Sequence, residues 1–371
     1  MRRLDFVDSL RGIAALYVVA FHTALIPNPA LAVPHWAQEV VLNGGTAVTL
    51  FFVVSAFSLC HTMRSRDGKT RPAREFYVRR LFRIAPLFYA MLALTASRDV
   101  LTFGAWHSAW SWAKCLFFIF NFFPGSETGI VWASWTIGVE MAFYAIFPLL
   151  FAQCTSLSSL AALAFAALLA AAGFGELVLH LPVTSEVQAS FFQFSVLRHL
   201  PVFIVGMMCW FIYDRYVEGR EYAKSIGAAL ILGSLWAYYA YLHGALNLGF
   251  PDIYYQQALL YSALLIGLAI LPSPIFVNRV TLLAGRISYS IYLLHPPIVF
   301  FLIPVYRRIY GLGLPVSVSF PLCLGVTLGV VTLAAMLTYR WIELPGMALG
   351  KRFLARGRAA PVPIVAAENS V

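Results

Sequence analysis

The stretch VSVSFPLCLGVTLGVVTLAAMLT, residues 316–338, contains no charged side chain. As a helix rising about 1.5 Å per residue, it is long enough to cross the roughly 30 Å hydrocarbon core of a bilayer. Similar apolar stretches recur along the 371-residue chain. The ten candidate spans are residues 12–27, 40–61, 82–97, 133–152, 157–178, 199–213, 225–243, 255–271, 286–305 and 316–338. The sequence therefore predicts an all-α, polytopic membrane helical bundle of about ten transmembrane helices.

The composition excludes a soluble globular protein. Hydrophobic residues make up 61% of the chain and charged residues 11%, whereas an average soluble domain carries about 25% charged residues. The chain has a net charge of +10, and its basic residues lie between the apolar spans. This placement indicates membrane topology rather than nucleic-acid binding. The sequence has no dinucleotide fingerprint and no Walker-type phosphate loop. Its five scattered cysteines predict reduced, structural thiols and no metal site.

The distribution of basic residues predicts the orientation. If the N-terminus is cytoplasmic and the spans alternate, 21 of the 26 lysine and arginine residues lie on the inner side. This bias follows the positive-inside rule and places both termini in the cytoplasm, whereas an odd number of spans would put the basic C-terminal segment outside. We therefore expect one transmembrane domain over residues 1–345 and a flexible, basic cytoplasmic tail over residues 346–371.

The stretch 98–132 has no clear assignment from sequence. It is rich in tryptophan and phenylalanine, which suits a membrane–water boundary. An interfacial segment, a re-entrant segment and an eleventh span all remain open for it.

Ionisable residues within apolar spans are costly to bury, so they are the first candidates for function. Arg11 and His22 are eleven residues apart, which puts them on one face of a helix with an axial separation of about 16 Å. A cation at the membrane boundary and a titratable base at depth suit a long anionic substrate that enters lengthwise. The alternative is a histidine bonded to a neighbouring helix and an arginine that snorkels to the headgroups.

Further polar groups interrupt three other spans. Arg79, Arg80 and Arg83 precede Pro86, and their planar guanidiniums suit phosphate, although the run taken alone is more simply explained by positive-inside anchoring at a helix start. Glu140 falls inside an apolar span, where it either acts chemically or forms a polar clasp between helices.

Ser288, Tyr292 and His295 form a single helical stripe. The stripe lines a cavity or packs as a clasp; spacing does not distinguish the two. Glu140 and Tyr144 are one turn apart, close enough to pair.

Together these residues resemble the acyltransferase family 3 membrane proteins. The family's opening pattern, an arginine, ten residues and a histidine, is similar to Arg11–His22. The other similar segments are FFVVSAFSL (51–59), RRLFRIAP (79–86), WTIGVEMAFYAIFP (135–148), HLPVFIVGM (199–207), ISYSIYLLH (287–295) and WIELP (341–345). Ala56 and Thr136 depart conservatively from the family pattern, and the resemblance runs in order along essentially the whole chain.

The resemblance implies an enzyme that transfers an acyl group, most often acetyl, from cytoplasmic acyl-CoA to a hydroxyl of an extracytoplasmic glycan or lipid-linked sugar. It implies a multi-pass protein of the bacterial inner membrane, with acyl-CoA as donor substrate, no bound cofactor and no nucleic-acid partner. On this reading His22 and Glu140 are catalytic. The expected substrate-binding residues are Arg11, Arg79, Arg80, Arg83, Ser288, Tyr292 and His295.

Rival functions remain at this stage. A transporter or flippase would also need buried charges, although the sequence shows no paired inverted halves. A structural or sensory membrane protein would not need the arginine, histidine and glutamate residues in these spans. A different class of membrane acyltransferase would use a late histidine such as His295, against which the Arg11–His22 pair argues. The acceptor and the acyl chain length are not fixed by the sequence.

Overall fold

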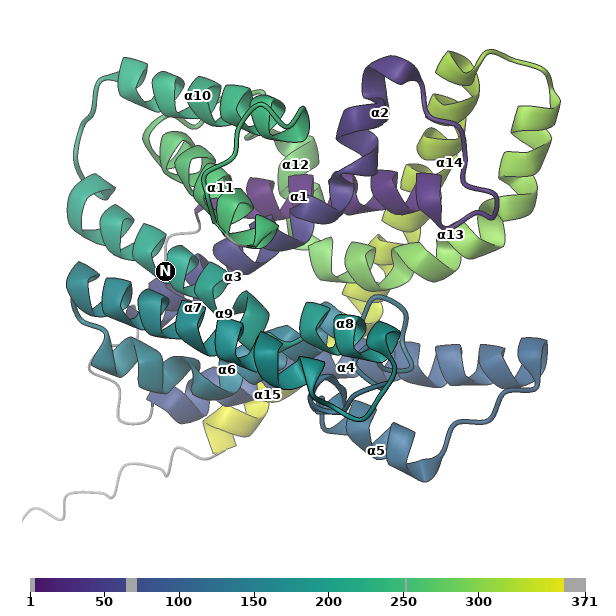
Figure 1. Cartoon of the computed structure of the whole chain (residues 1–371), viewed down its shortest axis with the longest axis horizontal. Helices are drawn as coiled ribbons and strands as arrows, with labels where there is room; N and C mark the ends of the chain where they lie inside the picture. The colour runs from purple at the N-terminus through teal and green to yellow at the C-terminus, as the bar shows by residue number, and fades with distance from the viewer. Residues whose placement is uncertain (1–3, 65–71, 251, 357–371) are drawn as a thin grey trace, which may run out of the picture.

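The computed structural model describes residues 4–64, 72–250 and 252–356 (Figure 1). Across these residues every regular element is helical, which confirms the all-α prediction. The helices are α1 (Asp5–Leu25), α2 (His35–Leu42), α3 (Ala47–Arg64), α4 (Pro72–Phe103), α5 (Ala109–Leu116), α6 (Trp135–Gln153), α7 (Leu157–Leu179), α8 (Ser185–Gln193), α9 (Val196–Ile212), α10 (Lys224–Leu242), α11 (Ile253–Ile270), α12 (Arg279–Arg286), α13 (Ser288–Gly311), α14 (Val316–Thr338) and α15 (Leu344–Arg356).

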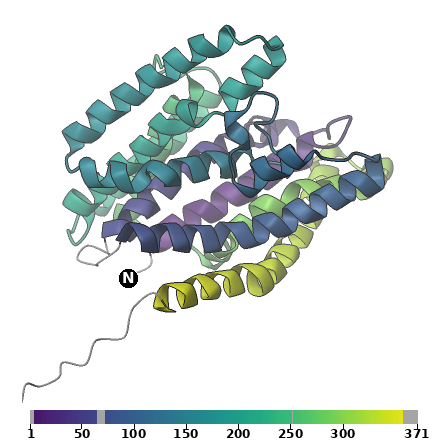
Figure 2. The same ribbon diagram turned by 90° about the horizontal axis from the view of Figure 1, so that it is seen from below.

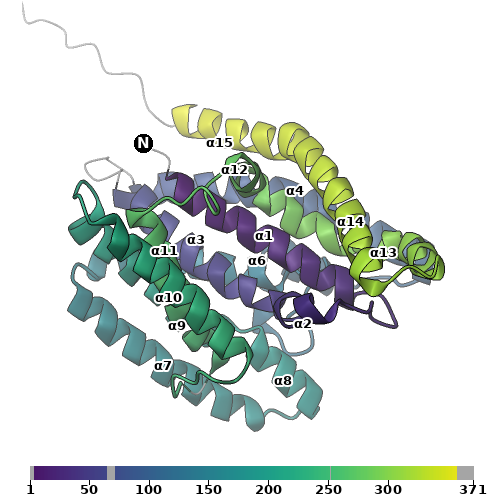
Figure 3. The ribbon, with the colours of Figure 1, turned by 90° about the horizontal axis from the view of Figure 1, so that it is seen from above.

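Nine helical stretches within the described residues are long and apolar enough to cross a membrane. α1 is not among them, although it has 21 residues, because polar side chains such as Asp8, Arg11 and His22 lower its hydropathy. It runs through the middle of the bundle, against α3, α12 and α13 (Figure 3). Protein therefore surrounds most of this helix, and its polar groups need not face lipid. The prediction of a polytopic bundle with about ten spans is confirmed.

The two ends of the bundle are distinct. α1 begins near Arg11 and ends near His22, so we name the ends after these residues. The start of α1 and the end of α15 lie at the Arg11 end, whereas the end of α4 and the turn between α13 and α14 lie at the His22 end (Figures 2 and 3).

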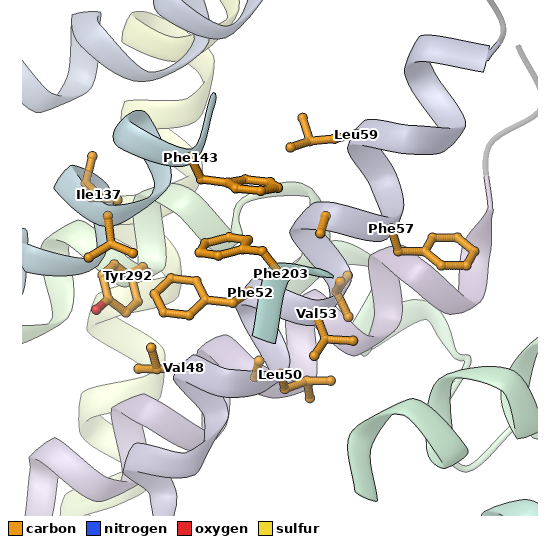
Figure 4. Packing of buried hydrophobic residues seen from close by; sticks show 14 of the residues in the cluster. Val48, Leu50, Phe52, Val53, Phe57, Leu59, Ile137, Phe143, Phe203 and Tyr292 are labelled. Carbon is orange, nitrogen blue, oxygen red and sulfur yellow. The ribbon is translucent and has the colours of Figure 1, made fainter. Parts of the chain in front are cut away.

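Aromatic side chains hold the centre of the bundle together. The ring of Phe203 in α9 stacks on Phe143 of α6 at 4.1 Å between centroids and lies 4.6 Å from Phe52 of α3 (Figure 4). All three side chains are fully buried. Such pairs add directional packing to the burial of apolar surface, so they fix α3, α6 and α9 relative to one another.

Glycine brings α1 and α12 into backbone contact. A Cβ at Gly12 would lie 2.2 Å from the Thr281 carbonyl oxygen, and one at Gly285 would lie 1.9 Å from the Asp8 carbonyl oxygen. Small residues permit this close approach between membrane helices, where van der Waals packing replaces the hydrophobic effect as the driving force. The contact fixes the part of α1 that carries Arg11.

The stretch 98–132 does not form an eleventh span. Its first residues continue α4 to Phe103, and its later helices are α5, with 8 residues, and a 3₁₀ turn of 3 residues at Phe120–Phe122. None of these is long enough to cross the bilayer. The segment is instead a folded loop at the His22 end.

A buried asparagine anchors this loop. The Asn121 amide nitrogen lies 3.2 Å from the carbonyl oxygen of Glu127, 3.0 Å from that of Trp135 and 2.9 Å from that of Phe194. Carbonyl groups in a loop have no ladder partner of their own, so the amide satisfies groups that would otherwise be costly to bury. The loop is therefore a fixed part of the bundle.

A helix replaces much of the flexible tail that the sequence predicted. α15 (Leu344–Arg356) packs on α4, with Gly346 against Pro86 and Gly350 against Phe82. The Phe353 ring also stacks on Phe82 at 6.1 Å. The prediction of a flexible chain is wrong for residues 346–356, and residues 357–371 lie outside the described residues.

Candidate functional site

A cavity with a water-accessible volume of about 70 Å³ lies between α1, α3, α4, α6 and α13. It gathers side chains from sequence segments up to nearly 300 residues apart. Its lining comprises Arg11, Val48, Phe51, Phe52, Ser55, Arg80, Arg83, Ile84, Thr136, Ile137, Glu140, Tyr144, Ser288, Tyr289 and Tyr292. The structure thus brings together six of the nine residues that the sequence analysis proposed.

Three guanidiniums give the cavity its chemical character. Arg11 comes from α1, and Arg80 and Arg83 come from α4, while Glu140 is the acidic residue among the described lining residues. The Arg80 guanidinium also lies 5.4 Å from the centre of the Tyr144 ring, which orients it over an aromatic face. An excess of fork-shaped cations beside apolar walls suits a ligand that carries phosphate groups.

Arg79 does not belong to this cavity. Its guanidinium forms an ion pair with Glu75 at 3.7 Å, one turn earlier on α4, and its side chain is 39% exposed. Consecutive residues on a helix point about 100° apart, so Arg79 and Arg80 cannot face the same cavity. The structure therefore separates Arg79 from Arg80 and Arg83, which the sequence analysis had grouped together.

His22 and His295 form a hydrogen-bonded pair. The Nδ1 atom of His22 lies 2.9 Å from the Nε2 atom of His295, and the ring centroids are 4.8 Å apart. His295 is fully buried, whereas His22 is partly exposed. The sequence analysis selected both residues but did not predict that they meet.

The partners of His295 determine the tautomer of the histidine pair. Its Nδ1 atom lies 3.2 Å from the Ile291 carbonyl oxygen, which can only accept a hydrogen bond. With both rings neutral, His295 carries its proton on Nδ1 and accepts at Nε2. His22 must then donate from Nδ1, so its own Nε2 keeps a free lone pair. This geometry leaves one basic nitrogen on the histidine pair, at His22 Nε2.

Neither histidine lines the cavity, and Tyr292 joins the two regions. Tyr292 is a lining residue, and its ring lies 5.6 Å from that of His295. Its hydroxyl accepts a hydrogen bond from Thr136 at 2.9 Å and donates to the Ala133 carbonyl oxygen at 3.2 Å. Arg11 and His22, which the sequence predicts on one face of a helix, therefore differ in the structure: Arg11 lines the cavity, whereas His22 is not among its lining residues and bonds to His295.

Glu140 belongs with the arginines rather than with the histidines. It lines the cavity beside Arg11, Arg80 and Arg83, whereas the side-chain partner of His22 in the described residues is His295. The predicted pairing of Glu140 with Tyr144 also differs from the structure, in which the Tyr144 hydroxyl lies 3.3 Å from that of Ser55. The structure thus supports no direct role for Glu140 in orienting His22.

Four lining hydroxyl residues, Ser55, Thr136, Tyr144 and Tyr289, and one buried carboxylate contact were not among the predicted site residues. Ser55 and Tyr289 line the cavity, and Tyr289 donates to the Ile84 carbonyl oxygen at 2.7 Å. Ser290 donates to the Glu343 carboxylate, which joins α13 to the turn before α15. The signal available for them was the presence of polar groups in otherwise apolar segments, but local spacing does not show which groups face a cavity.

The chain is similar in sequence to known acyltransferases. An acyltransferase domain family matches residues 4–339. The chain is 23% identical over 377 residues to O-acetyltransferase OatA of Staphylococcus aureus, in strains NCTC 8325 / PS 47, COL and MRSA252 alike. The alignment covers 93% of this chain but 57% of those relatives, so the chain spans little more than half their length.

No solved structure matches the chain. The family match nevertheless extends over nearly all the described residues and includes every residue of the cavity and of the histidine pair. An arginine-lined cavity and a paired histidine, set in a membrane bundle that matches an acyltransferase domain from end to end, identify the protein as a member of the acyltransferase family 3.

Proposed function

We propose that the protein transfers an acyl group, most simply acetyl, from acyl-CoA to a hydroxyl of an extracytoplasmic glycan. The observation that carries this proposal is the arrangement of three guanidiniums on one side of Tyr292 and a histidine pair on the other. The phosphate groups of a donor require cations such as the guanidiniums. The hydroxyl of an acceptor requires a base such as the histidine pair.

The donor is bound through its phosphates. Arg11, Arg80 and Arg83 provide charge-assisted hydrogen bonds to the nucleotide part of CoA. The bias of basic residues assigns the Arg11 end of the bundle to the cytoplasm, where acyl-CoA is available. Arg11 and His22 are about 16 Å apart along α1, a span that the extended pantetheine arm can cover.

His22 acts as the general base. Its Nε2 lone pair accepts the proton of the acceptor hydroxyl, and the oxygen attacks the thioester carbonyl carbon. The C–S bond breaks, the CoA thiolate leaves, and the proton held by His22 passes to that thiolate. Tyr292 and Thr136, which already share a hydrogen bond, lie beside this path and orient the carbonyl. His295 acts as a positioning residue because it fixes the tautomer of His22.

The direct test is acyl transfer by the purified full-length protein with labelled acetyl-CoA. The wild-type protein should release CoA and label glycans of the membrane fraction, whereas His22→Ala should do neither while it still inserts and folds. His35→Ala is the matched control because His35 is exposed at the start of α2. Equal CoA release by the wild type and His22→Ala would falsify the proposal, and solute uptake without CoA release would favour a transporter.

A further inference from the structure

A second hollow lies at the His22 end, beside the last turns of α4. Its water-accessible volume is about 430 Å³, and Ser97, Val100, Trp106, His107 and Trp112 are among its lining residues. The Trp106 side chain is 83% exposed, so one indole face is free to stack on a ligand. The volume falls within the roughly 300–1,000 Å³ of small-molecule sites. We call this hollow the α4 groove.

His107 lines the α4 groove, and Asp99 and Arg98 form hydrogen bonds behind it; we call these three side chains the polar rim. Asp99 accepts from Arg98 at 2.5 Å through one carboxylate oxygen, and its other oxygen lies 2.9 Å from His107 Nε2. The Arg98 side chain is only 8% exposed and that of Asp99 13%. Because the guanidinium and the carboxylate offset each other, this rim offers hydrogen bonds without a large net charge.

The rim also connects to the candidate active site. The Arg98 guanidinium stacks over the Trp132 ring at 4.2 Å, and that ring meets Phe300 edge to face at 5.4 Å. The next residue, Ala133, accepts the hydrogen bond from Tyr292. The polar rim of the α4 groove is therefore connected to Tyr292 through Trp132 and Ala133.

We propose that the α4 groove is a subsite for a neutral saccharide, and that it holds the glycan acceptor while a hydroxyl reaches His22. The inference rests on the proposed function. A sugar ring has an apolar face that stacks on indole and a perimeter of hydroxyls that pair with carboxylate, guanidinium and imidazole groups. Trp106 and Trp112 supply the first kind of contact, and Ser97 and His107 supply the second.

Two other occupants fit the groove less well. Tryptophans at a membrane boundary serve as an aromatic belt, but a belt needs no buried ion pair. A phospholipid headgroup would bring its negative charge toward the Asp99 carboxylate, which is already engaged with Arg98. A neutral ligand with many hydroxyls uses both the aromatic faces and the balanced polar rim.

The test measures saccharide binding by saturation-transfer-difference NMR on the full-length protein in lipid nanodiscs. The probes are maltotriose, cellotriose and chitotriose. We expect saturation transfer to the ring protons of at least one of them. Trp106→Ala and Trp112→Ala should each weaken its apparent affinity by about fivefold, which corresponds to about 1 kcal/mol of lost stacking. Trp36→Ala is the matched control because Trp36 is 75% exposed on α2, outside the groove.

Each contrary result overturns the subsite. These results are no transfer to any trisaccharide, equal binding by Trp112→Ala and the wild type, or loss of the signal on addition of phosphatidylglycerol, which would assign the groove to lipid. CoA release from acetyl-CoA in the presence of a glycan-containing membrane fraction, measured on the same protein preparation, separates this proposal from the proposed function. Saccharide binding without CoA release would retain the subsite and reject the transferase. CoA release without saccharide binding would retain the transferase and reject the subsite.

Discussion

At the scale of single residues, neighbours in the sequence have separate roles because a helix turns them apart. Arg80 faces the cavity, while Arg79, the preceding residue, pairs with Glu75. Likewise the role that we assign to His295 depends on one contact, the 2.9 Å hydrogen bond that fixes the tautomer of His22. The chemistry therefore depends on the direction of individual side chains more than on the number of charged residues.

The two neighbouring arginines provide a paired test of donor binding. Arg80→Ala should raise the KM for acetyl-CoA by about tenfold or more with a smaller change in kcat, because it removes a charge-assisted contact worth about 1.5–3 kcal/mol. Arg79→Ala should leave the KM for acetyl-CoA within about twofold of the wild type, because Arg79 does not line the cavity and pairs with Glu75. Steady-state kinetics on both variants check this, and a larger effect of Arg79→Ala would contradict the assignment.

Substitution of His295 tests the tautomer argument. His295→Gln keeps an amide oxygen that accepts from His22 Nδ1, whereas His295→Leu leaves that donor unpaired and frees the tautomer. We expect kcat to fall by about tenfold to a hundredfold in His295→Leu and to be partly restored in His295→Gln, with little change in the KM for acetyl-CoA. Equal losses in the two variants would show that the residue serves packing alone.

At the scale of helices, close backbone contacts position the cavity residues. α1 and α12 meet at Gly12 and Gly285, and α15 meets α4 at Gly346 and Gly350. The first contact lies one residue from Arg11, and the second lies against the turn of α4 that includes Phe82 and Pro86. The cavity arginines are thus positioned by contacts with helices that do not themselves line the cavity.

The glycine contact between α1 and α12 predicts a specific defect. Gly285→Ala should lower the Tm of the purified protein and raise the KM for acetyl-CoA, because a Cβ there would lie 1.9 Å from the Asp8 carbonyl oxygen and push α1 and Arg11 away. Gly329→Ala in α14 is the control, since a Cβ there has no neighbour within 4 Å and alanine favours a helix by about 1 kcal/mol. Equal Tm values for the two variants would refute the contact.

At the scale of the whole molecule, the bundle has two chemically different ends. The start of α1 and the end of α15 lie at one end, and the folded loop of residues 104–132 lies at the other (Figures 1 and 2). If the Arg11 end faces the cytoplasm, donor and acceptor approach the histidine pair from opposite sides of the membrane. No soluble intermediate would then have to cross the bilayer.

The orientation is testable with reporter fusions to the full chain. A green fluorescent protein at the C-terminus should fluoresce, and alkaline phosphatase at the same position should be inactive, because the bias of basic residues predicts a cytoplasmic C-terminus. Fusion of the phosphatase within the loop at Gly104 should give the opposite result. An active phosphatase at the C-terminus would reverse the assignment and remove cytoplasmic acyl-CoA as the donor.

The sequence by itself determined the helical spans and the shared face of Arg11 and His22. Hydropathy and helical periodicity are local properties, so lipid exposure and the 3.6-residue repeat fix them without knowledge of neighbouring helices. For the same reason the sequence identified Ser288, Tyr292 and His295 as one stripe. Hydropathy is a weaker guide for α1, because polar side chains lower its hydropathy and protein rather than lipid surrounds most of it.

Only the tertiary structure decided which polar groups meet. His22 pairs with a residue 273 positions away, Glu140 lies with the arginines, and residues expected to form a loose tail become α15. Contacts between membrane helices depend on close packing and on the pairing of isolated polar groups, and neither leaves a periodic signal in one segment. The helices could therefore be predicted from the sequence, whereas the candidate site is formed only by the packing of those helices.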